Sequence, residues 1–143
     1  MKILCFVILL VVFSISISAD EYVIDVNNDG EPDKWIEYDG ADAQRIRTDR
    51  NYDGTVDYIA IFDDEGTIVR ESFDYNYDGT MDNFYFYDNG VLDRQEIDSN
   101  YDDQIDIWLY IREGTYITRY EQDTNHDGEV DRIRDYTEEA EES

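Results

Sequence analysis

A nine-residue acidic motif returns five times along the chain at almost constant spacing. It reads Asp-x-Asn-x-Asp-Gly-x-x-Asp in four copies, and the fourth copy has Asp103 in place of the glycine. Successive copies start 24 or 25 residues apart. The copies occupy residues 25–33, 49–57, 74–82, 98–106 and 123–131. A fixed period of this kind is typical of repeat proteins, in which each unit packs on the next.

The segments between the motifs predict β-strands. About five residues after each closing aspartate are rich in aromatic and β-branched types, which favour strands. Turn sequences such as Asn89-Gly90 follow, and a second apolar segment such as 91–97 leads into the next motif. The first strands are expected at 34–38, 58–62, 83–87, 107–111 and 132–136.

These elements together predict an all-β fold. We expect an antiparallel meander of about ten short strands, built from five hairpin repeats of 24–25 residues. The acidic loops would lie along one edge of the sheet and the tight turns along the other. The sheet could form an open spiral, a solenoid or a barrel-like shape.

The first 19 residues predict a secretory signal peptide. A basic start at Lys2 precedes an apolar run at 3–13, and small residues precede the acidic Asp20. Cleavage is expected after Ser18 or Ala19. A membrane span is the alternative, but the run is short for crossing a bilayer. The predicted organisation is therefore a signal peptide (1–19), a five-repeat domain (20–136) and a disordered acidic tail (137–143). The processed protein would be secreted or extracytoplasmic, in the periplasm or at the cell surface, and not membrane-bound.

The charge of the chain limits its partners. The formal net charge is −26, which would normally favour disorder, yet 15% of the residues are aromatic, which favours a folded chain. Bound cations would reconcile the two observations. Nucleic acid and anionic membrane surfaces are excluded as partners, because binding them requires clustered basic residues.

Each acidic motif predicts a calcium-binding loop. Calcium prefers six to eight oxygen ligands, and positions 1, 3, 5 and 9 of the motif supply carboxylate and amide oxygens. Position 7 would add a backbone carbonyl, and the glycine at position 6 permits the sharp turn. The candidate ligands for up to five Ca²⁺ ions are Asp25, Asn27, Asp29 and Asp33; Asp49, Asn51, Asp53 and Asp57; Asp74, Asn76, Asp78 and Asp82; Asp98, Asn100, Asp102 and Asp106; and Asp123, Asn125, Asp127 and Asp131.

Other interpretations of these loops are weaker. Oxygen-only ligation disfavours zinc, copper and iron, and magnesium tends to keep its waters. The metal-free alternative is an acidic surface turn, since Asn, Asp and Gly are common in turns. Five copies in one phase favour calcium, with an affinity of about 0.1–1 mM. The fourth loop is expected to be the poorest site, because Asp103 must adopt a conformation that glycine takes more easily.

The loop resembles two known calcium-binding patterns. It matches the EF-hand ligand pattern through position 9, but position 12 is never glutamate and strands replace the helices. It is more similar to the hairpin loops of FG-GAP and VCBS repeats, in which the form found at 25–33 is frequent. Those blades are longer than this period, so the resemblance implies calcium binding by the loop alone. The segment 87–92 is similar to YD (Rhs-type) repeats, which form long antiparallel sheets.

Two further columns of residues keep the repeat register. Four residues before the later motifs stand Arg45, Arg70, Arg94 and Arg119, which we expect to pair with carboxylates or to stack on aromatic rings. Two residues after each motif stand Trp35, Ile59, Phe84, Trp108 and Ile133, which we expect to pack in the core. Both faces of the first strand of each repeat carry large residues, and exposed Tyr and Trp columns there could stack on sugar rings.

The sequence therefore favours a structural or surface-interaction protein that calcium stabilises. The alternative is a carbohydrate-binding or adhesive surface protein, and the partner in either case would be an extracellular protein or a glycan. An enzyme is not expected, because the acidic residues that could form a catalytic pair already belong to the repeat. His126 stands at a loop position that supplies no ligand, and the sequence gives it no catalytic role.

Overall fold

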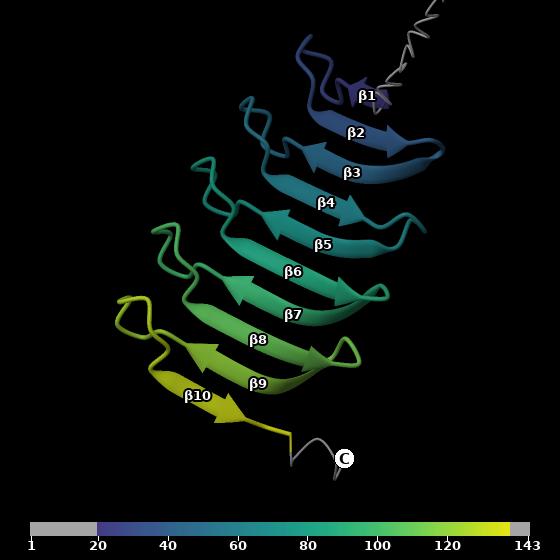
Figure 1. Ribbon diagram of the computed structural model, residues 1–143. Coiled ribbons are helices and arrows are strands. Elements are labelled where there is room, and N and C mark those ends of the chain that lie inside the picture. The colour runs from purple at the N-terminus through teal and green to yellow at the C-terminus, as the bar shows by residue number, and fades with distance from the viewer. Residues whose placement is uncertain (1–19, 138–143) are drawn as a thin grey trace, which may run out of the picture.

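The computed structural model describes residues 20–137, and these form one antiparallel sheet of ten strands. The predicted signal peptide and all but the first residue of the predicted tail lie outside the described residues. The strands are arranged in chain order, as expected for a meander (Figure 1). Their bounds are β1 Asp20–Ile24, β2 Lys34–Asp39, β3 Asp42–Thr48, β4 Tyr58–Phe62, β5 Ile68–Phe73, β6 Asn83–Asp88, β7 Val91–Ile97, β8 Ile107–Arg112, β9 Tyr116–Gln122 and β10 Arg132–Asp135.

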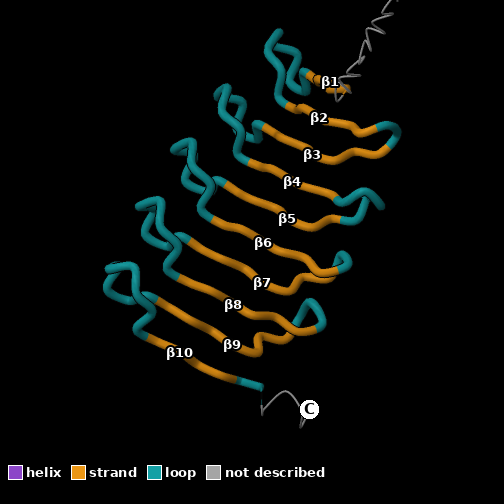
Figure 2. Tube along the Cα trace, in the orientation of Figure 1, coloured by secondary structure: helices purple, strands orange, loops and turns teal. Residues whose placement is uncertain are grey.

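Acidic loops and tight turns lie at opposite edges of the sheet (Figure 2). The five loops connect β1 to β2, β3 to β4, β5 to β6, β7 to β8 and β9 to β10. Tight turns connect the remaining pairs, with Asn89 and Gly90 both at positive φ between β6 and β7. Such turns match the twist of the strands that they join. The strands β1 and β10 are not paired with each other, so the sheet is open.

A β-bulge precedes the arginine column in every tight-turn hairpin. The register shifts by one residue between β2 and β3, β4 and β5, β6 and β7, and β8 and β9. The extra residues are Gln44, Val69, Asp93 and Thr118, each directly before a column arginine. Bulges increase the local twist and re-aim the following side chain. The repeat thus places its arginines in one row across the sheet.

The sheet is a single layer, and its best buried side chains are acidic. Ala60 is the one hydrophobic side chain that is fully buried among residues 20–137. The largest fully buried side chains are six aspartates of the loops, including Asp57 and Asp74, which are both 0% exposed. The column predicted to pack in the core is half-buried at Trp35, Ile59, Phe84 and Trp108, and the prediction is wrong for Ile133, which is exposed. The reason is that no second layer covers either face.

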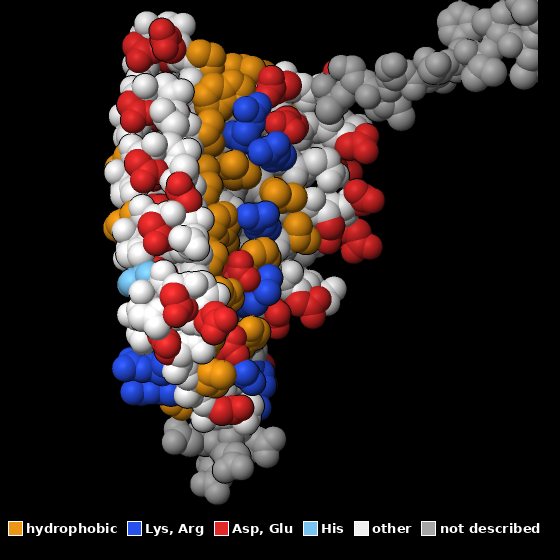
Figure 3. Space-filling view, turned by 60° about the vertical axis from the view of Figure 1, so that its left-hand side comes forward, with side chains coloured by type: hydrophobic (Ala, Val, Ile, Leu, Met, Phe, Trp, Pro, Cys, Tyr) orange, Lys and Arg blue, Asp and Glu red, His pale blue; other side chains and the backbone are white. Residues whose placement is uncertain are grey.

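One face of the sheet carries the arginine column between apolar side chains, and we call it the arginine face. The strand register places Arg70 opposite Phe86, Phe86 opposite Arg94, and Arg94 opposite Tyr110. The Arg94 guanidinium lies 4.3 Å from the Phe86 ring centre and that of Arg70 lies 5.4 Å from it. A band of hydrophobic and basic side chains runs along the sheet (Figure 3). Arginine stems thus cover apolar surface that would otherwise face water.

The opposite face, which we call the tyrosine face, carries a second cluster of aromatic residues. Tyr58, Tyr85 and the loop residue Tyr75 surround Phe73 with ring centres 4.9 to 5.5 Å away. Glu71 accepts hydrogen bonds from the hydroxyl groups of Tyr58 and Tyr87. In the described part of the chain no helix is long and apolar enough to span a membrane.

Candidate metal-binding loops

All five loops take the same backbone path. Their fourth and sixth residues have positive φ, for example 64° at Tyr52 and 92° at Gly54 in the second loop. The fourth loop does this without glycine, because Asp103 has φ 69°. L-residues rarely adopt this conformation, so other interactions must stabilise it.

The aspartates at positions 1 and 9 provide those interactions. In the second loop, Asp49 Oδ1 accepts the Tyr52 N–H at 2.6 Å and Asp49 Oδ2 accepts the Gly54 N–H at 2.7 Å. Asp57 Oδ2 accepts the Arg50 N–H at 2.7 Å and the Asn51 N–H at 3.1 Å. The opening and closing carboxylates therefore organise the loop backbone, as Asx-type turns do.

Neighbouring loops bury each other's aspartates. The N–H of each later opening aspartate donates to the carbonyl of the preceding closing one, as in Asp49 to Asp33 at 2.8 Å and Asp74 to Asp57 at 2.9 Å. Every opening or closing aspartate that has such a neighbour is at most 3% exposed. Asp25 and Asp131 stand at the two ends of the row, and they are half-buried and exposed respectively. The burial of a site therefore depends on the loop beside it.

Two loops bring three carboxylates together. Asp49, Asp53 and Asp57 of the second loop each offer an oxygen, and these atoms lie within 4.8 Å of one another. Asp74, Asp78 and Asp82 of the third loop do the same. In the described residues, the first, fourth and fifth loops form no such group, although the sequence predicts all five as sites.

One oxygen of the second loop has no partner. Asp57 is 0% exposed, and its Oδ1 accepts no hydrogen bond. A buried carboxylate oxygen without a partner is costly, because it has lost water and gained nothing in return. A cation bound to this oxygen would supply the missing partner.

The third loop shows the same electrostatic conflict in its closing residue. Burial raises the pKa of Asp82, and the charges of Asp74 and Asp78 raise it further. Hydrogen bonds from the Tyr75 and Asn76 N–H groups act in the other direction without cancelling these effects. Burial, with a smaller contribution from the neighbouring carboxylates, therefore disfavours the ionised form of Asp82, and a bound cation would favour that form.

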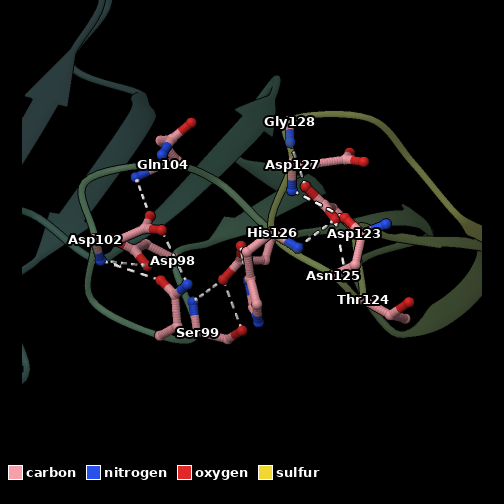
Figure 4. A network of polar contacts seen from close by, with 12 residues as sticks. Asp98, Ser99, Asp102, Gln104, Asp123, Thr124, Asn125, His126, Asp127 and Gly128 are labelled. Atoms are coloured by element: carbon pink, nitrogen blue, oxygen red, sulfur yellow. Dashed lines mark hydrogen bonds and ion pairs between the residues drawn. The ribbon is translucent and has the colours of Figure 1, made fainter.

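The fourth and fifth loops satisfy their closing aspartates with side-chain donors. Ser99 Oγ donates to Asp106 Oδ2 at 2.8 Å, and Thr124 Oγ1 donates to Asp131 Oδ2 at 2.6 Å. The same position holds Val, Arg or Tyr in the first three loops. His126 of the fifth loop also reaches toward the fourth loop (Figure 4). Its Nδ1 lies 2.7 Å from Asp106 Oδ1. Both oxygens of Asp106 therefore have partners.

These contacts shift the pKa values of the pair. Burial raises the pKa of Asp106, but the hydrogen bonds from His126 and Ser99 outweigh it and leave the pKa lowered. The hydrogen bond to Asp106 raises the pKa of His126. Sequence reasoning missed the contact of His126 because it considered each loop alone. It missed Ser99 and Thr124 because it did not consider position 2 as a partner of the closing aspartate. The sequence held one signal for these contacts. Ser99 and Thr124 replace Val, Arg or Tyr at position 2, and His126 replaces Asn or Tyr at position 4.

The second and third loops fit a hard divalent cation. Each triad offers three carboxylate oxygens, which calcium and magnesium prefer, and neither triad contains nitrogen or sulfur ligands. The amide Asn51 Nδ2 donates to Asp53 Oδ2 at 2.9 Å, so the Asn51 and Asp53 side chains already face each other across the loop.

Comparison with known proteins identifies the fold but not the family. No protein-family model matches the chain, and no curated protein matches it. A similar chain occurs in the crystal structure of accessory secretory protein 1, 2 and 3 in Streptococcus pneumoniae, with a TM-score of 0.50 and 17% sequence identity. The match covers 73% of this chain and 19% of that one, so this chain spans about a fifth of the length of its structural neighbour. The likeness concerns the fold.

Proposed function

We propose that this protein is a secreted, non-enzymatic β-repeat protein whose acidic loops bind calcium and so stabilise the sheet for a structural or surface-interaction role. The observation that carries the proposal is the second loop, where Asp57 Oδ1 is buried without a partner beside Asp49 and Asp53. The third loop repeats the triad. The predicted signal peptide at 1–19 would deliver the loops to a calcium-rich compartment.

Calcium would act on stability because the loops bury one another. A cation in the second or third loop neutralises carboxylates that the folded sheet holds together and the unfolded chain does not. At ten times the dissociation constant, each site would stabilise the fold by about 1.4 kcal/mol. We expect the second and third loops to bind first, and the fourth to bind last.

Calorimetric titration of the full chain with calcium, and separately with magnesium, tests the proposal. We expect at least two calcium ions per chain at about 0.1–1 mM, and weaker binding of magnesium. Melting curves by circular dichroism should move to higher temperature when chelator is replaced by calcium. No binding heat together with identical melting curves would reject calcium binding.

Matched variants locate the sites. Asp53→Asn removes the exposed carboxylate of the triad in the second loop. It should lower the calcium stoichiometry by one without unfolding the chain. Asp64→Asn removes the same charge from an exposed turn outside the loops and should leave the titration unchanged. If the two variants behave alike, the effect is one of net charge and not of a site.

The partner in the proposed role is an extracellular protein or a glycan. Trp35 is only partly available for stacking on a sugar ring, since the Arg47 guanidinium lies 5.4 Å from its ring centre. Trp108 is half-buried between Glu96 and Glu121 on the adjacent strands. Binding to a glycan array that is lost in Trp108→Ala with the fold retained would support the glycan alternative.

A further inference from the structure

The two end strands are complementary halves of one hairpin. β1 leads into an acidic loop, as β3, β5, β7 and β9 do, and β10 follows a loop, as β2, β4, β6 and β8 do. Inside the chain, each strand of the second kind pairs across a tight turn with a strand of the first kind. Among residues 20–137, β1 pairs with β2 alone and β10 with β9 alone. The free edge of β10 therefore matches the free edge of β1 as the two strands of a tight-turn hairpin match each other.

We propose that β10 of one copy pairs with β1 of a second copy, joining chains head to tail in the register that the repeats use internally. That register places the residue two after a closing aspartate opposite the residue two before the next opening aspartate, as Trp35 stands opposite Arg47. Applied to the ends, it places Ile133 opposite Val23 of the second copy and Arg134 opposite Tyr22. This pairing of end strands does not require bound calcium.

The apolar exposure at the ends supports this pairing. Tyr22 is 61% exposed, Val23 is 44% exposed and Ile133 is 55% exposed. Repeat arrays usually finish in polar caps, and isolated edge strands are usually protected by charge or proline. These three side chains would be covered by the strand of a second copy.

The charges of the end strands favour the unlike pair. β1 begins with Asp20 and Glu21, whereas β10 carries Arg132 and Arg134 and one acidic residue, Asp135. Pairing two β1 strands would bring four acids together, and pairing two β10 strands would bring four arginines together. The unlike pair brings Arg134 beside Tyr22 and diagonal to Asp20. Its one unfavourable contact, Glu21 opposite Asp135, is moderated by Arg119, which stands opposite Asp135 within the chain.

The first and last loops each lack a neighbouring loop on one side. Every inner junction buries an opening and a closing aspartate and links them by a backbone hydrogen bond, as in Asp98 to Asp82 at 2.8 Å. Asp25 and Asp131 are the opening and closing aspartates without such a neighbour in the described chain. Head-to-tail pairing would bring them together and continue the row of loops. Because the contact is heterologous and does not close, repeated association would give linear assemblies.

A charge exchange followed by sedimentation velocity tests the proposal on the full chain. The wild type should associate as concentration rises, and less so at high salt, since the contact is partly electrostatic. Arg132→Glu with Arg134→Glu makes both ends acidic. Asp20→Arg with Tyr22→Arg places positive charge opposite and diagonal to Arg134 and leaves Glu21 in its ion pair with Arg47, so each double variant should stay monomeric. An equimolar mixture of the two should associate again. Asp64→Arg with Glu65→Arg, in an exposed turn, is the matched control and should behave as the wild type.

Several outcomes overturn the pairing. These are a wild type that is monomeric at every concentration up to about 100 µM, a double variant that associates as the wild type does, and a mixture that remains monomeric. Association that depends on calcium but ignores these charges would likewise assign the contact to the loops and reject the end strands.

Cysteine cross-linking tests the register itself. In a Cys5→Ser background, Val23→Cys with Ile133→Cys should form disulfide-linked multimers on mild oxidation, because the two positions lie opposite each other on one face. Val23→Cys with Arg132→Cys places the thiols on opposite faces and should remain uncoupled. Equal cross-linking in both variants, or none in either, would contradict the proposed register.

Discussion

The imidazole Nδ1 of His126 lies 2.7 Å from Oδ1 of Asp106, and so a residue of the fifth loop contacts the closing aspartate of the fourth. The corresponding oxygen of the second loop, Asp57 Oδ1, has no partner. The residue at the position of His126 is Tyr52, Tyr77 or Tyr101 in the three preceding loops. His126 therefore gives Asp106 Oδ1 a partner that Asp57 Oδ1 lacks.

Replacing this histidine with the residue of the other loops should improve the fourth site. His126→Tyr frees Asp106 Oδ1 for a cation, so we expect the calcium affinity of the fourth loop to rise severalfold. Calorimetry would resolve that loop in a background of Asp53→Asn and Asp78→Asn, which disable the two strongest sites. His126→Gln retains a donor for Asp106 and should have a smaller effect. Unchanged affinity in His126→Tyr would show that His126 does not compete with the metal.

Restoring glycine at position 6 of the fourth loop should stabilise the sheet. Asp103 has φ 69°, a conformation that costs a non-glycine residue about 1 kcal/mol. Asp103→Gly removes this cost, which corresponds to a rise in melting temperature of about 4 °C for a domain of this size. Asp103→Ala removes the same charge but keeps the strained φ, so thermal melts of the two variants separate strain from charge. Equal melting temperatures would contradict the interpretation.

The strands could be predicted from the sequence because each rests on local information. Composition predicted a strand at 83–87 and the structure has Asn83–Asp88, while the apolar segment 91–97 matches Val91–Ile97. Asn89 and Gly90 fix the turn between them through their positive φ. The open, unclosed sheet was one of three shapes that this pattern allowed.

Burial and site geometry could not be predicted in the same way. Both faces of a strand such as β6 carry large side chains, and the sequence does not show whether a second layer covers them. The partners of a closing aspartate include residues of the next loop, about 20 positions away, as the contact of His126 with Asp106 shows. The identity of nine residues therefore predicts a loop, whereas the hydrogen-bond partners of its closing aspartate also depend on the neighbouring loop.

The tyrosine face should make the sheet sensitive to alkali. Burial and a hydrogen bond with Tyr75 raise the pKa of Tyr85 to about 12, above about 10 in an unfolded chain. A group with a raised folded-state pKa contributes stability that is fully present below its unfolded pKa and is lost as pH rises through the folded value. Urea unfolding should therefore show a stability that declines from about pH 10 to about pH 12.

The phenylalanine variant of Tyr85 isolates this effect. Tyr85→Phe removes the ionising hydroxyl and should move the midpoint of alkaline unfolding to higher pH, measured by circular dichroism with tyrosinate absorbance in parallel. Tyr116→Phe removes a phenol that is 50% exposed near a tight turn and serves as the control. An equal displacement in both variants would mean that the number of phenols, and not the position of Tyr85, sets the midpoint.

The arginine face should depend on the planar guanidinium and not only on its charge. Arg94 stacks 4.3 Å from the Phe86 ring centre and forms an ion pair with Glu96 at 3.1 Å. Arg94→Lys keeps the charge but loses the flat contact, so we expect it to lower the free energy of unfolding by about 0.5–1 kcal/mol. Arg134→Lys, on the exposed end strand, should change it by less than about 0.5 kcal/mol.

A double-mutant cycle assigns the Arg94 effect to the ring. If stacking on Phe86 is the cause, Arg94→Lys should cost little once Phe86→Leu has removed the aromatic face, leaving a coupling energy of about 0.5 kcal/mol or more. Urea midpoints at constant m-value would measure all four corners of the cycle. Additive losses of stability would assign the effect to the Arg94–Glu96 ion pair, because Phe86→Leu leaves that contact intact. Coupling, in contrast, would show how a single-layer sheet stabilises aromatic side chains without a second layer: arginines of neighbouring strands cover the rings from the solvent side.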